Sequence, residues 1–384
     1  MIIEQRFTIR YHYNIHFITG VFNADNPTFG DILSAHSNSG FSPSLLFVID
    51  SNVGAQHPQL LSAIKNYLYQ NMPGSNSPHF LIIPGGEKAK ESSNAYQAIL
   101  NAIHQYNIDR HSFVVAIGGG AVCDVTGFAA TVAHRGIKLI RIPTTTLAQN
   151  DAAIGVKNSI NAFGKKNFLG TFSTPVAVIN DGAFLKTLSS RVWISGISEA
   201  IKVALIKDAR FFERMEQLAP ALTAGNEDAM LETIIQCAKL HLQHIASGDP
   251  FETGSSRPLD FGHWSAHKLE HMSGYKLLHG EAVAIGMALD CTYANMMGYL
   301  SSDALNRILD LLSGLNLPVT HPLLEDTEAL LNGLNEFREH LGGVLTIPLL
   351  RDIGETCNVS IIDEPTMRCA AKKLAAVSQP TSLV

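Results

Sequence analysis

The hydrophobic positions in residues 1–180 form short runs that alternate with segments of helical periodicity. Apolar runs of this kind are typical of buried strands, and the periodic segments between them predict helices. The runs lie at Leu45–Asp50, Phe80–Pro84, Phe113–Ile117, Leu139–Pro143 and Val176–Asn180, with helices expected at Pro58–Tyr69 and Ser92–Tyr106. Because Gly, Pro or Asp bounds most of the runs, we expect a parallel sheet covered by helices on both faces, in a Rossmann-like α/β domain.

From about residue 181 the hydrophobic pattern changes to long helical periods. Helices are expected at Ser195–Ile206, Ala209–Leu218, Glu227–Ile245, His263–Ser273 and Glu281–Met297. Near the end, Gly343–Leu350 fits either a strand or a turn of apolar helix, because periodicity does not separate the two over so few residues. We therefore predict two domains, an α/β domain at 1–180 and an all-helical domain at 181–384.

Composition narrows the class of protein. The chain has 384 residues, of which 46% are hydrophobic and 16% charged, so it can bury a sizeable core and is not predominantly disordered. A formal charge of -6 disfavours a dedicated nucleic-acid binder. The five cysteines form no CxxC pair, which argues against a disulfide framework and favours a reducing cytoplasm. The amino-terminal MIIEQRFTIRYHYNIHF has no apolar run long enough for a signal peptide or membrane span, so we expect neither.

A triple glycine is the strongest local signal for phosphate chemistry. In the run GGGAVCD, Gly118, Gly119 and Gly120 follow a predicted strand directly and precede a helical stretch. Glycines let the backbone approach a pyrophosphate, and the helix start offers it free N–H groups. The spacing is not GxGxxG, so the ordinary dinucleotide motif is absent, and a plain strand-to-helix turn is the alternative.

Polar residues at two other strand ends are weaker indications of a ligand site. The run PGGEKAK places Glu87, Lys88 and Lys90 on a glycine turn, which by itself fits a solvated turn well. Asp50 ends the first predicted strand, where its carboxylate fits either an acceptor for ribose hydroxyls or a cap for the next helix.

A cluster of charged and polar residues follows the strand at Leu139–Pro143. It comprises PTTT at 143–146, Asp151, Lys157 and GKKN at 164–167. In a chain this poor in charge, the cluster suggests a pocket for an anionic, hydroxylated ligand, with a solvated basic loop as the alternative.

The helical half holds candidate metal ligands. His263 and His267 lie at i and i+4 on one predicted helix, and His279 lies at the start of the next. Glu199 adds a carboxylate, with Lys202 one turn further along. A His/His/Glu set leaves coordination positions open, as a catalytic rather than structural metal site requires. Because the chain has 16 histidines, a chance HxxxH spacing is the alternative.

Taken together and in order, these motifs resemble the 3-dehydroquinate synthase family, the sugar-phosphate cyclases. The similarity runs from about Asp50 to Gly354 and rests on PGGEKAK, GGGAVCD, HRGIKLIRIPTTTLAQND, GKKNFLG, FLKTL, ISEAIK, GHWSAHKLE and LHGEAVAIGM. The resemblance implies one NAD in the amino-terminal domain, one zinc or cobalt ion in the helical domain, a sugar-phosphate substrate and a homodimer. The sequence GHWSAHKLE, with SRPLDFGH before it, resembles the divergent dehydroquinate-synthase-like proteins of bacterial ebo clusters more than the usual dehydroquinate synthases.

The resemblance also assigns roles to individual residues. Metal ligation falls to Glu199, His263 and His279. Dinucleotide contacts fall to Asp50, Glu87, Lys90, Gly119, Gly120, Asp124, Thr144, Thr145, Lys166, Phe184, Leu185, Lys186 and Thr187. Substrate and catalytic roles fall to Asp151, Lys157, Asn167, Lys202, Lys239 and His267, with Arg135 reaching the partner subunit's site.

The implied reaction converts a heptulose or heptulosonate 7-phosphate to a carbocycle. A ring hydroxyl is oxidised with NAD, phosphate leaves by elimination, the ketone is reduced again, and an aldol addition closes the ring. The rival is a metal-dependent, NAD-linked polyol or alcohol dehydrogenase similar to glycerol dehydrogenases, which share the GGG turn and histidine ligands. The cluster of Lys157, Lys166 and Asn167 favours the cyclase, because alcohol oxidation needs no phosphate site. A catalytically inactive binding protein with the same fold is a third reading.

Departures from the family pattern bear on the substrate. Asp260 stands where dehydroquinate synthases carry Asn, Ser256 stands where they carry Arg, with Arg257 beside it, and Arg338-Glu339 replaces a Lys-Lys pair. His267 differs from the Pro that valiolone-forming cyclases tend to carry. Carboxylates repel a phosphate unless cations pair with them, so these changes argue against the usual doubly anionic substrate and leave the sugar open.

Overall fold

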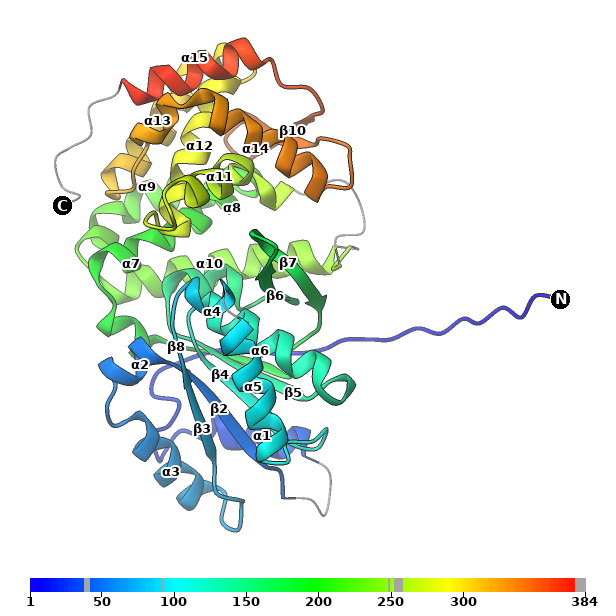
Figure 1. The fold of residues 1–384 in the computed structure, drawn as a ribbon. Helices are drawn as coiled ribbons and strands as arrows, with labels where there is room; N and C mark the ends of the chain where they lie inside the picture. The colour runs from blue at the N-terminus through cyan, green and yellow to red at the C-terminus, as the bar shows by residue number, and fades with distance from the viewer. Residues whose placement is uncertain (38–41, 92, 248, 252–257, 377–384) are drawn as a thin grey trace. The chain divides into compact units, whose positions relative to one another are not determined.

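The computed structural model describes residues 1–37, 42–91, 93–247, 249–251 and 258–376 (Figure 1). The chain divides into two compact units. The first unit comprises residues 1–144 and 153–184, and the second comprises residues 145–152 and 185–384. Ser256 and Arg257, two of the positions that bear on the substrate, lie outside the described residues.

A six-stranded parallel sheet forms the centre of the first unit, in the order β1-β8-β5-β4-β2-β3. The strands are β1 (Asn14–Ile18), β2 (Leu45–Asp50), β3 (His79–Ile83), β4 (Phe113–Gly118), β5 (Lys138–Pro143) and β8 (Ala177–Asp181). Every residue of β2 and β4 is buried, which requires cover on both faces of the sheet. The predicted parallel sheet is therefore confirmed.

Helices flank this sheet. They are α1 (Thr28–His36), α2 (Ser51–Gln56), α3 (Leu60–Asn71), α4 (Lys88–Glu91), α5 (Ser93–Gln105), α6 (Gly120–Val132) and the short 3₁₀-helix Ala133–Arg135. Phe29 of α1 and Ile64 of α3 pack with Phe47 and Ile49 in one core cluster on one side of the sheet. Helices α5 and α6 also pack against the central strands.

The lysine-bearing stretch after β5 forms an antiparallel hairpin rather than a loop. Strands β6 (Lys157–Ala162) and β7 (Lys165–Phe172) are joined at Phe163 and Gly164, which both have positive φ, as a two-residue hairpin turn requires. Fully buried Arg141 anchors the chain before and within β6, donating to the carbonyl of Gly155 at 2.7 Å and to Asn158 Oδ1 at 2.6 Å. The hairpin is thus a fixed part of the first unit.

The second unit is helical apart from one hairpin in its described residues. Its helices are the π-helix Ala148–Ala152, α7 (Ser190–Ser195), α8 (Ile197–Lys207), α9 (Ala209–Thr223), α10 (Glu227–Ala246), α11 (His263–Met272), α12 (His279–Met296), α13 (Ser302–Gly314), α14 (Thr327–His340) and α15 (Glu364–Ala375), with 3₁₀-helices at Pro258–Asp260 and Pro322–Glu325. The 3₁₀-helix Gly182–Thr187 begins in the first unit and ends in the second. Strands β9 (Ile347–Asp352) and β10 (Glu355–Val359) pair antiparallel, so the ambiguous Gly343–Leu350 stretch contains a strand.

Helices α8 and α12 form the core of the second unit. Residues 197–206 of α8 and 280–294 of α12 are all buried, as expected for helices that are covered all round. The predicted helix from Ser195 is broken at Gly196, where a Cβ would lie 2.3 Å from the backbone nitrogen of Leu147. This close approach joins the segment 145–152 to the start of α8.

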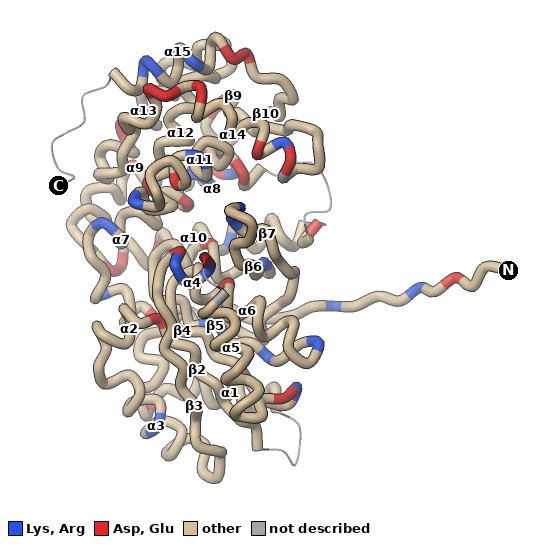
Figure 2. The backbone as a smooth tube through the Cα atoms, in the orientation of Figure 1, with Lys and Arg blue, Asp and Glu red and all other residues tan. Residues whose placement is uncertain are grey.

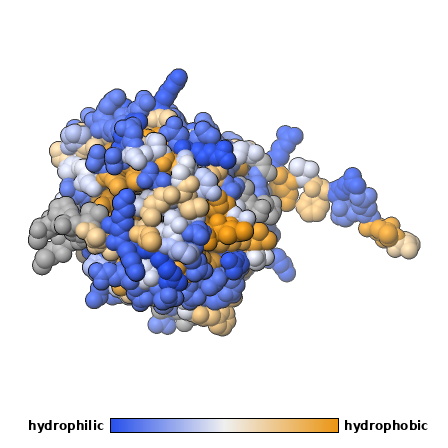
Figure 3. All heavy atoms as spheres, turned by 90° about the horizontal axis from the view of Figure 1, so that it is seen from above, coloured by the Kyte–Doolittle hydropathy of each residue, from blue (hydrophilic) through white to orange (hydrophobic). Residues whose placement is uncertain are grey.

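The segment before β1 has no helix or strand. Its apolar side chains at Met1, Ile2, Ile3, Phe7 and Ile9 are all exposed (Figure 3). No helix in the described part of the chain is both long and apolar enough to span a bilayer.

Candidate active site

Three side chains that the sequence suggested as metal ligands converge in the second unit. Glu199 lies in the first turn of α8, and His263 and His279 begin α11 and α12. The Nε2 atoms of His263 and His279 lie 3.7 and 3.6 Å from Oε1 of Glu199. One ligand atom from each residue lies within 4.8 Å of the other two, a spacing that suits a single ion.

The protonation of both imidazoles suits this arrangement. Nδ1 of His263 lies 3.0 Å from the carbonyl oxygen of Phe261, and Nδ1 of His279 lies 3.1 Å from Oε2 of Glu270. A carbonyl or carboxylate only accepts, so each Nδ1 donates there, and Nε2 is the ring nitrogen nearest Glu199. Burial, with the nearby Lys202, lowers the pKa of His263 well below its ordinary value. His263 is therefore neutral, as a metal ligand must be.

Glu199 is a buried carboxylate that a cation would satisfy. Its side chain is fully buried and ion-paired with Lys202, yet neither oxygen accepts a hydrogen bond of ordinary geometry from the described residues. Burial raises the pKa of Glu199, but the charge of Lys202 outweighs this and holds the pKa below its usual range. A buried charge without hydrogen bonds is costly, and a divalent ion between Glu199, His263 and His279 would remove that cost. The three residues thus fit zinc or cobalt.

Close packing of α11 on α12 sets the position of His263. Gly262 has φ +75°, and a Cβ there would lie 2.9 Å from the backbone nitrogen of Met287. Fully buried Asp290 of α12 accepts from the backbone of Gly262 at 3.1 Å and from the indole of Trp264 at 2.9 Å. The glycine and tryptophan of the GHW motif therefore fix where α11 begins.

Asp151, assigned to the substrate by resemblance, lies near the same carboxylate. It belongs to the π-helix Ala148–Ala152, which Asn150 ties to α8 by donating to the carbonyl of Gly196 at 2.7 Å. Oδ1 of Asp151 lies 3.1 Å from Nε2 of His241 on α10. Ligand atoms of Asp151, Glu199 and His241 also lie within 4.8 Å of one another. The segment 145–152 thus contributes to the second unit.

Lys202 is the cation at the centre of these carboxylates. Its side chain is 2% exposed. Burial lowers its pKa, but Glu199 and Asp151 raise it, and the net pKa lies above the ordinary value. The charge of Asp260 acts in the same direction. The aspartate that replaces the family's Asn therefore faces a cation, which reduces its repulsion of an anionic ligand.

In the first unit, assigned residues meet in a polar network. The buried Lys90 ammonium lies 2.6 Å from Asp124 Oδ2, donates to Ser159 Oγ at 2.9 Å and contacts Asn167 Oδ1. Glu87 accepts from Asn161 at 2.8 Å. Lys90 therefore ties α4 and α6 to the β6–β7 hairpin, and cationic residues lie on both α4 and the hairpin (Figure 2).

Removal of the Lys90 ammonium should destabilise the first unit. Lys90→Met leaves the Asp124 carboxylate without its partner and unties the hairpin, so we expect the free energy of unfolding to fall by about 3 kcal/mol. Denaturant unfolding of the purified protein measures this change. Lys88→Met, at an exposed position on the same short helix, is the control and should change it by less than about 0.5 kcal/mol. Equal effects of the two substitutions would contradict the role of the network.

The residues assigned to NAD follow neighbouring strands. Asp50 ends β2, Gly119 and Gly120 follow β4, Thr144 follows β5, and Phe184 follows β8. The strand order reverses between β2 and β4, and ligands of open α/β sheets bind at such a switch point. Asp50 accepts from the backbone of Asn52 at 2.8 Å, and burial raises its pKa. Asp50 caps α2, as one of the two sequence-based interpretations predicted. This cap does not prevent the same carboxylate from also accepting a hydrogen bond from a ribose hydroxyl.

The cluster that the sequence suggested around Asp151 is divided between the two units. Lys157, Lys166 and Asn167 lie on the hairpin of the first unit, whereas Asp151 belongs to the second. Thr145 also belongs to the second unit.

Of the other assigned residues, one lies beside the three converging side chains and two lie at more exposed positions. His267 is beside them, with its ring centroid 5.4 Å from that of His263. Lys186, in the 3₁₀-helix shared with Leu185 and Thr187, is half exposed and ion-paired with Glu227 at 3.0 Å. Lys239 is exposed on α10, two residues from His241 and so on a different face of the helix.

Two further sequence-predicted residues lie at exposed positions. Arg135 is exposed on the turn after α6 and has φ +60°. Glu339 is exposed near the end of α14. The predictions for Arg135 and Glu339 remain predictions.

Sequence reasoning missed two polar side chains of this site. Glu270 is 4% exposed and accepts from His279, and its place in GHWSAHKLE, seven residues after His263, is a signal that could have indicated it. His241 is 2% exposed and contacts Asp151. Its run, KLHLQH, carries no distinguishing spacing.

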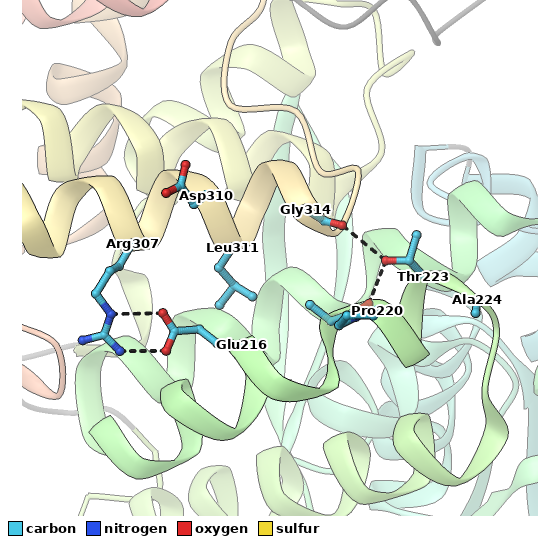
Figure 4. A pocket seen from close by; sticks show the side chains of 9 residues that line it. Glu216, Pro220, Thr223, Ala224, Arg307, Asp310, Leu311 and Gly314 are labelled. Carbon is cyan, nitrogen blue, oxygen red and sulfur yellow. Dashed lines mark hydrogen bonds and ion pairs between the residues drawn. The ribbon is translucent and has the colours of Figure 1, made fainter.

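A groove elsewhere in the second unit has no predicted site residue. It has a volume of about 670 Å³ and lies between α9 and α13, where Arg307 and Glu216 form an ion pair at 2.7 Å (Figure 4). Pro220 and Leu311 line it as well. We assign no catalytic role to this groove.

Comparisons with known proteins agree with the sequence motifs. The family description 3-dehydroquinate synthase N-terminal matches residues 80–195, and 3-dehydroquinate synthase C-terminal matches residues 196–337. The 3-dehydroquinate synthase of Thermodesulfovibrio yellowstonii is 34% identical over 279 residues, covering 72% of this chain and 77% of that protein.

Solved structures of sugar cyclases share the fold. The 2-epi-5-epi-valiolone synthase ValA from Streptomyces hygroscopicus subsp. jinggangensis 5008, with NAD⁺ and Zn²⁺ bound, superposes with a TM-score of 0.87 and 29% identity over 97% of this chain and 99% of that one. A 2-deoxy-scyllo-inosose synthase complexed with carbaglucose-6-phosphate, NAD⁺ and Co²⁺ superposes with a TM-score of 0.77 and 22% identity over 94% of this chain and 96% of that one.

Proposed function

This chain belongs to the 3-dehydroquinate synthase family, and from that premise we propose that it is a sugar-phosphate cyclase that uses recycled NAD and a divalent metal. Its substrate is a heptulose or heptulosonate 7-phosphate, from which it releases phosphate and forms a carbocycle. The observation that carries the proposal is the convergence of His263 and His279 on the buried carboxylate of Glu199.

Both cofactors have residues suited to them. Glu199, His263 and His279 would hold zinc or cobalt, and Glu270 would orient His279. The carboxyl ends of β2, β4 and β5 would hold NAD, with Gly119 and Gly120 against the pyrophosphate at the start of α6. When bound, NAD would supply a reversible hydride acceptor and the metal would supply a Lewis acid.

Charged side chains of the chain itself handle protons and phosphate. Asp151, held ionised, accepts a hydrogen bond from a substrate hydroxyl and orients it. Lys202 remains protonated between carboxylates and stabilises negative charge on a substrate oxygen. Lys157 and Asn167 bind the phosphate group and stabilise its charge as it leaves. His267, beside His263, donates a hydrogen bond to the substrate.

The departures from the family pattern favour a substrate other than the usual heptulosonate. Asp260 acts on Lys202, so one cation is already engaged by protein carboxylates. The chain therefore has less positive charge to offer a second anionic group of the substrate. This fits a sugar phosphate without a carboxylate.

We further propose a cytoplasmic homodimer in which Arg135 contributes to the partner's site. An exposed arginine on a left-handed turn is suited to bind an anion outside its own subunit. Size-exclusion chromatography with light scattering tests the dimer, and mixing Arg135→Ala chains with chains inactivated at Glu199 tests for a shared site by restored activity.

Release of inorganic phosphate tests the proposed function. Incubation of the metal-loaded protein and catalytic NAD with a panel of heptulose and hexose phosphates should release phosphate from at least one sugar, with NMR showing a carbocyclic product. NADH should not accumulate, because the hydride returns to the substrate. Steady NADH formation from an unphosphorylated polyol would favour the dehydrogenase instead. A protein that retains no metal and gains no thermal stability from NAD would favour the inactive binding protein.

A further inference from the structure

His241 pairs with Asp151 in a buried position that no motif indicates. Its Nε2 lies 3.1 Å from Oδ1 of Asp151, and its Nδ1 lies 3.1 Å from the carbonyl oxygen of Cys237, one turn earlier on α10. The His241 side chain is 3% exposed, whereas that of Asp151 is 30% exposed. The histidine is therefore enclosed by protein, and the aspartate is the member of the pair that a ligand can reach.

The contacts define the charge of this pair. A backbone carbonyl only accepts a hydrogen bond, so Nδ1 of His241 must donate to Cys237. Nε2 lies 3.1 Å from a carboxylate oxygen, which is an ion-pair distance, although Nε2 makes no hydrogen bond of ordinary geometry with the described residues. A protonated His241 therefore forms a buried ion pair with Asp151. The pKa directions agree: burial lowers that of His241, but Asp151 raises it well above the ordinary value.

The position of Asp151 depends on α10 because its own segment is short. Asp151 lies in a five-residue π-helix that packs against α10 and α8. Asn150 fixes the backbone of that segment to Gly196, but it does not fix the carboxylate of its neighbour. A ligand atom of Glu199 lies within 4.8 Å of Asp151, and like charge repels Asp151 from it. His241 supplies the opposite charge that holds the carboxylate in place.

We propose that His241 is a positioning residue that holds the Asp151 carboxylate toward the substrate, an inference that rests on the proposed function. One carboxylate oxygen contacts His241, and the exposed remainder of Asp151 contacts a substrate hydroxyl. His241 itself contacts no substrate. An apolar residue could fill the same space, so a purely structural role would need no charge beside Asp151.

Kinetics of two substitutions separate positioning from packing. His241→Leu keeps the volume but loses both donors, and we expect kcat for phosphate release to fall about 100-fold, with a change in KM of less than about threefold. His241→Gln keeps a donor for Asp151 and should recover activity to within about tenfold of the unmodified protein. Gln243→Leu, at an exposed position on the same helix, is the control and should change neither constant.

A double-mutant cycle tests whether His241 acts through Asp151. In an Asp151→Asn background, His241→Leu should lower kcat by less than about threefold, because the carboxylate that it positions is gone. A full 100-fold loss in that background, or equal losses from His241→Leu and His241→Gln, would overturn the proposal.

Crystal structures provide a readout that does not depend on turnover. With metal and NAD bound, the Asp151 carboxylate of His241→Leu should be rotated away from its position in the unmodified protein, and that of His241→Gln should not. If the unmodified protein releases phosphate from no sugar phosphate, the proposed function fails, and the Asp151 rotamer alone still decides whether His241 holds it. An unmoved Asp151 in His241→Leu overturns the positioning role.

Discussion

His263→Ala should lose its bound metal and at least about a thousandfold of its phosphate-release activity, while binding NAD as before. The substitution removes the Nε2 that points at Glu199 and leaves two ligands, too few to retain a zinc or cobalt ion. A Lewis acid contributes several kcal/mol to transition-state stabilisation, which corresponds to a loss of this size. Elemental analysis measures the metal, and isothermal titration measures NAD binding.

Two further variants make this result interpretable. His271→Ala removes an exposed histidine from the same helix and should retain both ligands and full activity. His263→Gln keeps a polar side chain in the buried position, so it separates loss of the metal from loss of folding. If His263→Ala lost metal and NAD together while remaining folded, the assignment of the two sites to different domains would be wrong.

Lys157→Ala should weaken binding of a phosphorylated substrate far more than binding of its unphosphorylated analogue. A hydrogen bond to a charged group contributes about 1.5 to 3 kcal/mol, so we expect the KM for the sugar phosphate to rise about 10-fold to 100-fold. The inhibition constant of the unphosphorylated analogue should change by less than about threefold. Competition assays with both compounds measure the two effects in the same preparation.

The β6–β7 hairpin offers a matched control for this prediction. Lys165→Ala removes an exposed lysine from the start of β7, where its ammonium lies over the ring of Phe168. It should alter the binding of both compounds little. Equal losses of binding for the two compounds in Lys157→Ala would show that Lys157 does not bind the phosphate group. The assignment of the metal site would not be affected.

Local pattern was enough to predict most of the sheet. The runs at β2, β4, β5 and β8 are apolar because both faces of those strands are covered, and this gives a clear signal. Strand β3 lies at the edge of the sheet and is only partly buried, but its apolar run was still long enough to predict it. Strand β1 was missed because it lies at the edge of the sheet and reads NIHFI, with partly exposed positions. The β6–β7 hairpin is outside the predicted strands because it is rich in polar residues and largely exposed on β7.

The candidate metal ligands could be predicted, but the groups that support them could not. His263 and His279 stand at helix starts beside glycines, within motifs that a sequence displays directly. By contrast, His241 contacts Asp151 across 90 positions of sequence, through packing of α10 on the π-helix. Asp290 similarly fixes Gly262 and Trp264 from another helix. Such contacts follow from tertiary packing, for which the local pattern carries no signal.

Return of the hydride to its own carbon tests the proposed chemistry most directly. A sugar phosphate that the protein accepts is prepared with deuterium on the carbon whose hydroxyl is oxidised, and the product is analysed by NMR and mass spectrometry. The account predicts a carbocycle that keeps the deuterium at that carbon, with one phosphate released per product and no deuterium in the NAD pool. Deuterium that accumulates in NADH, with the phosphate still attached to the sugar, would contradict it.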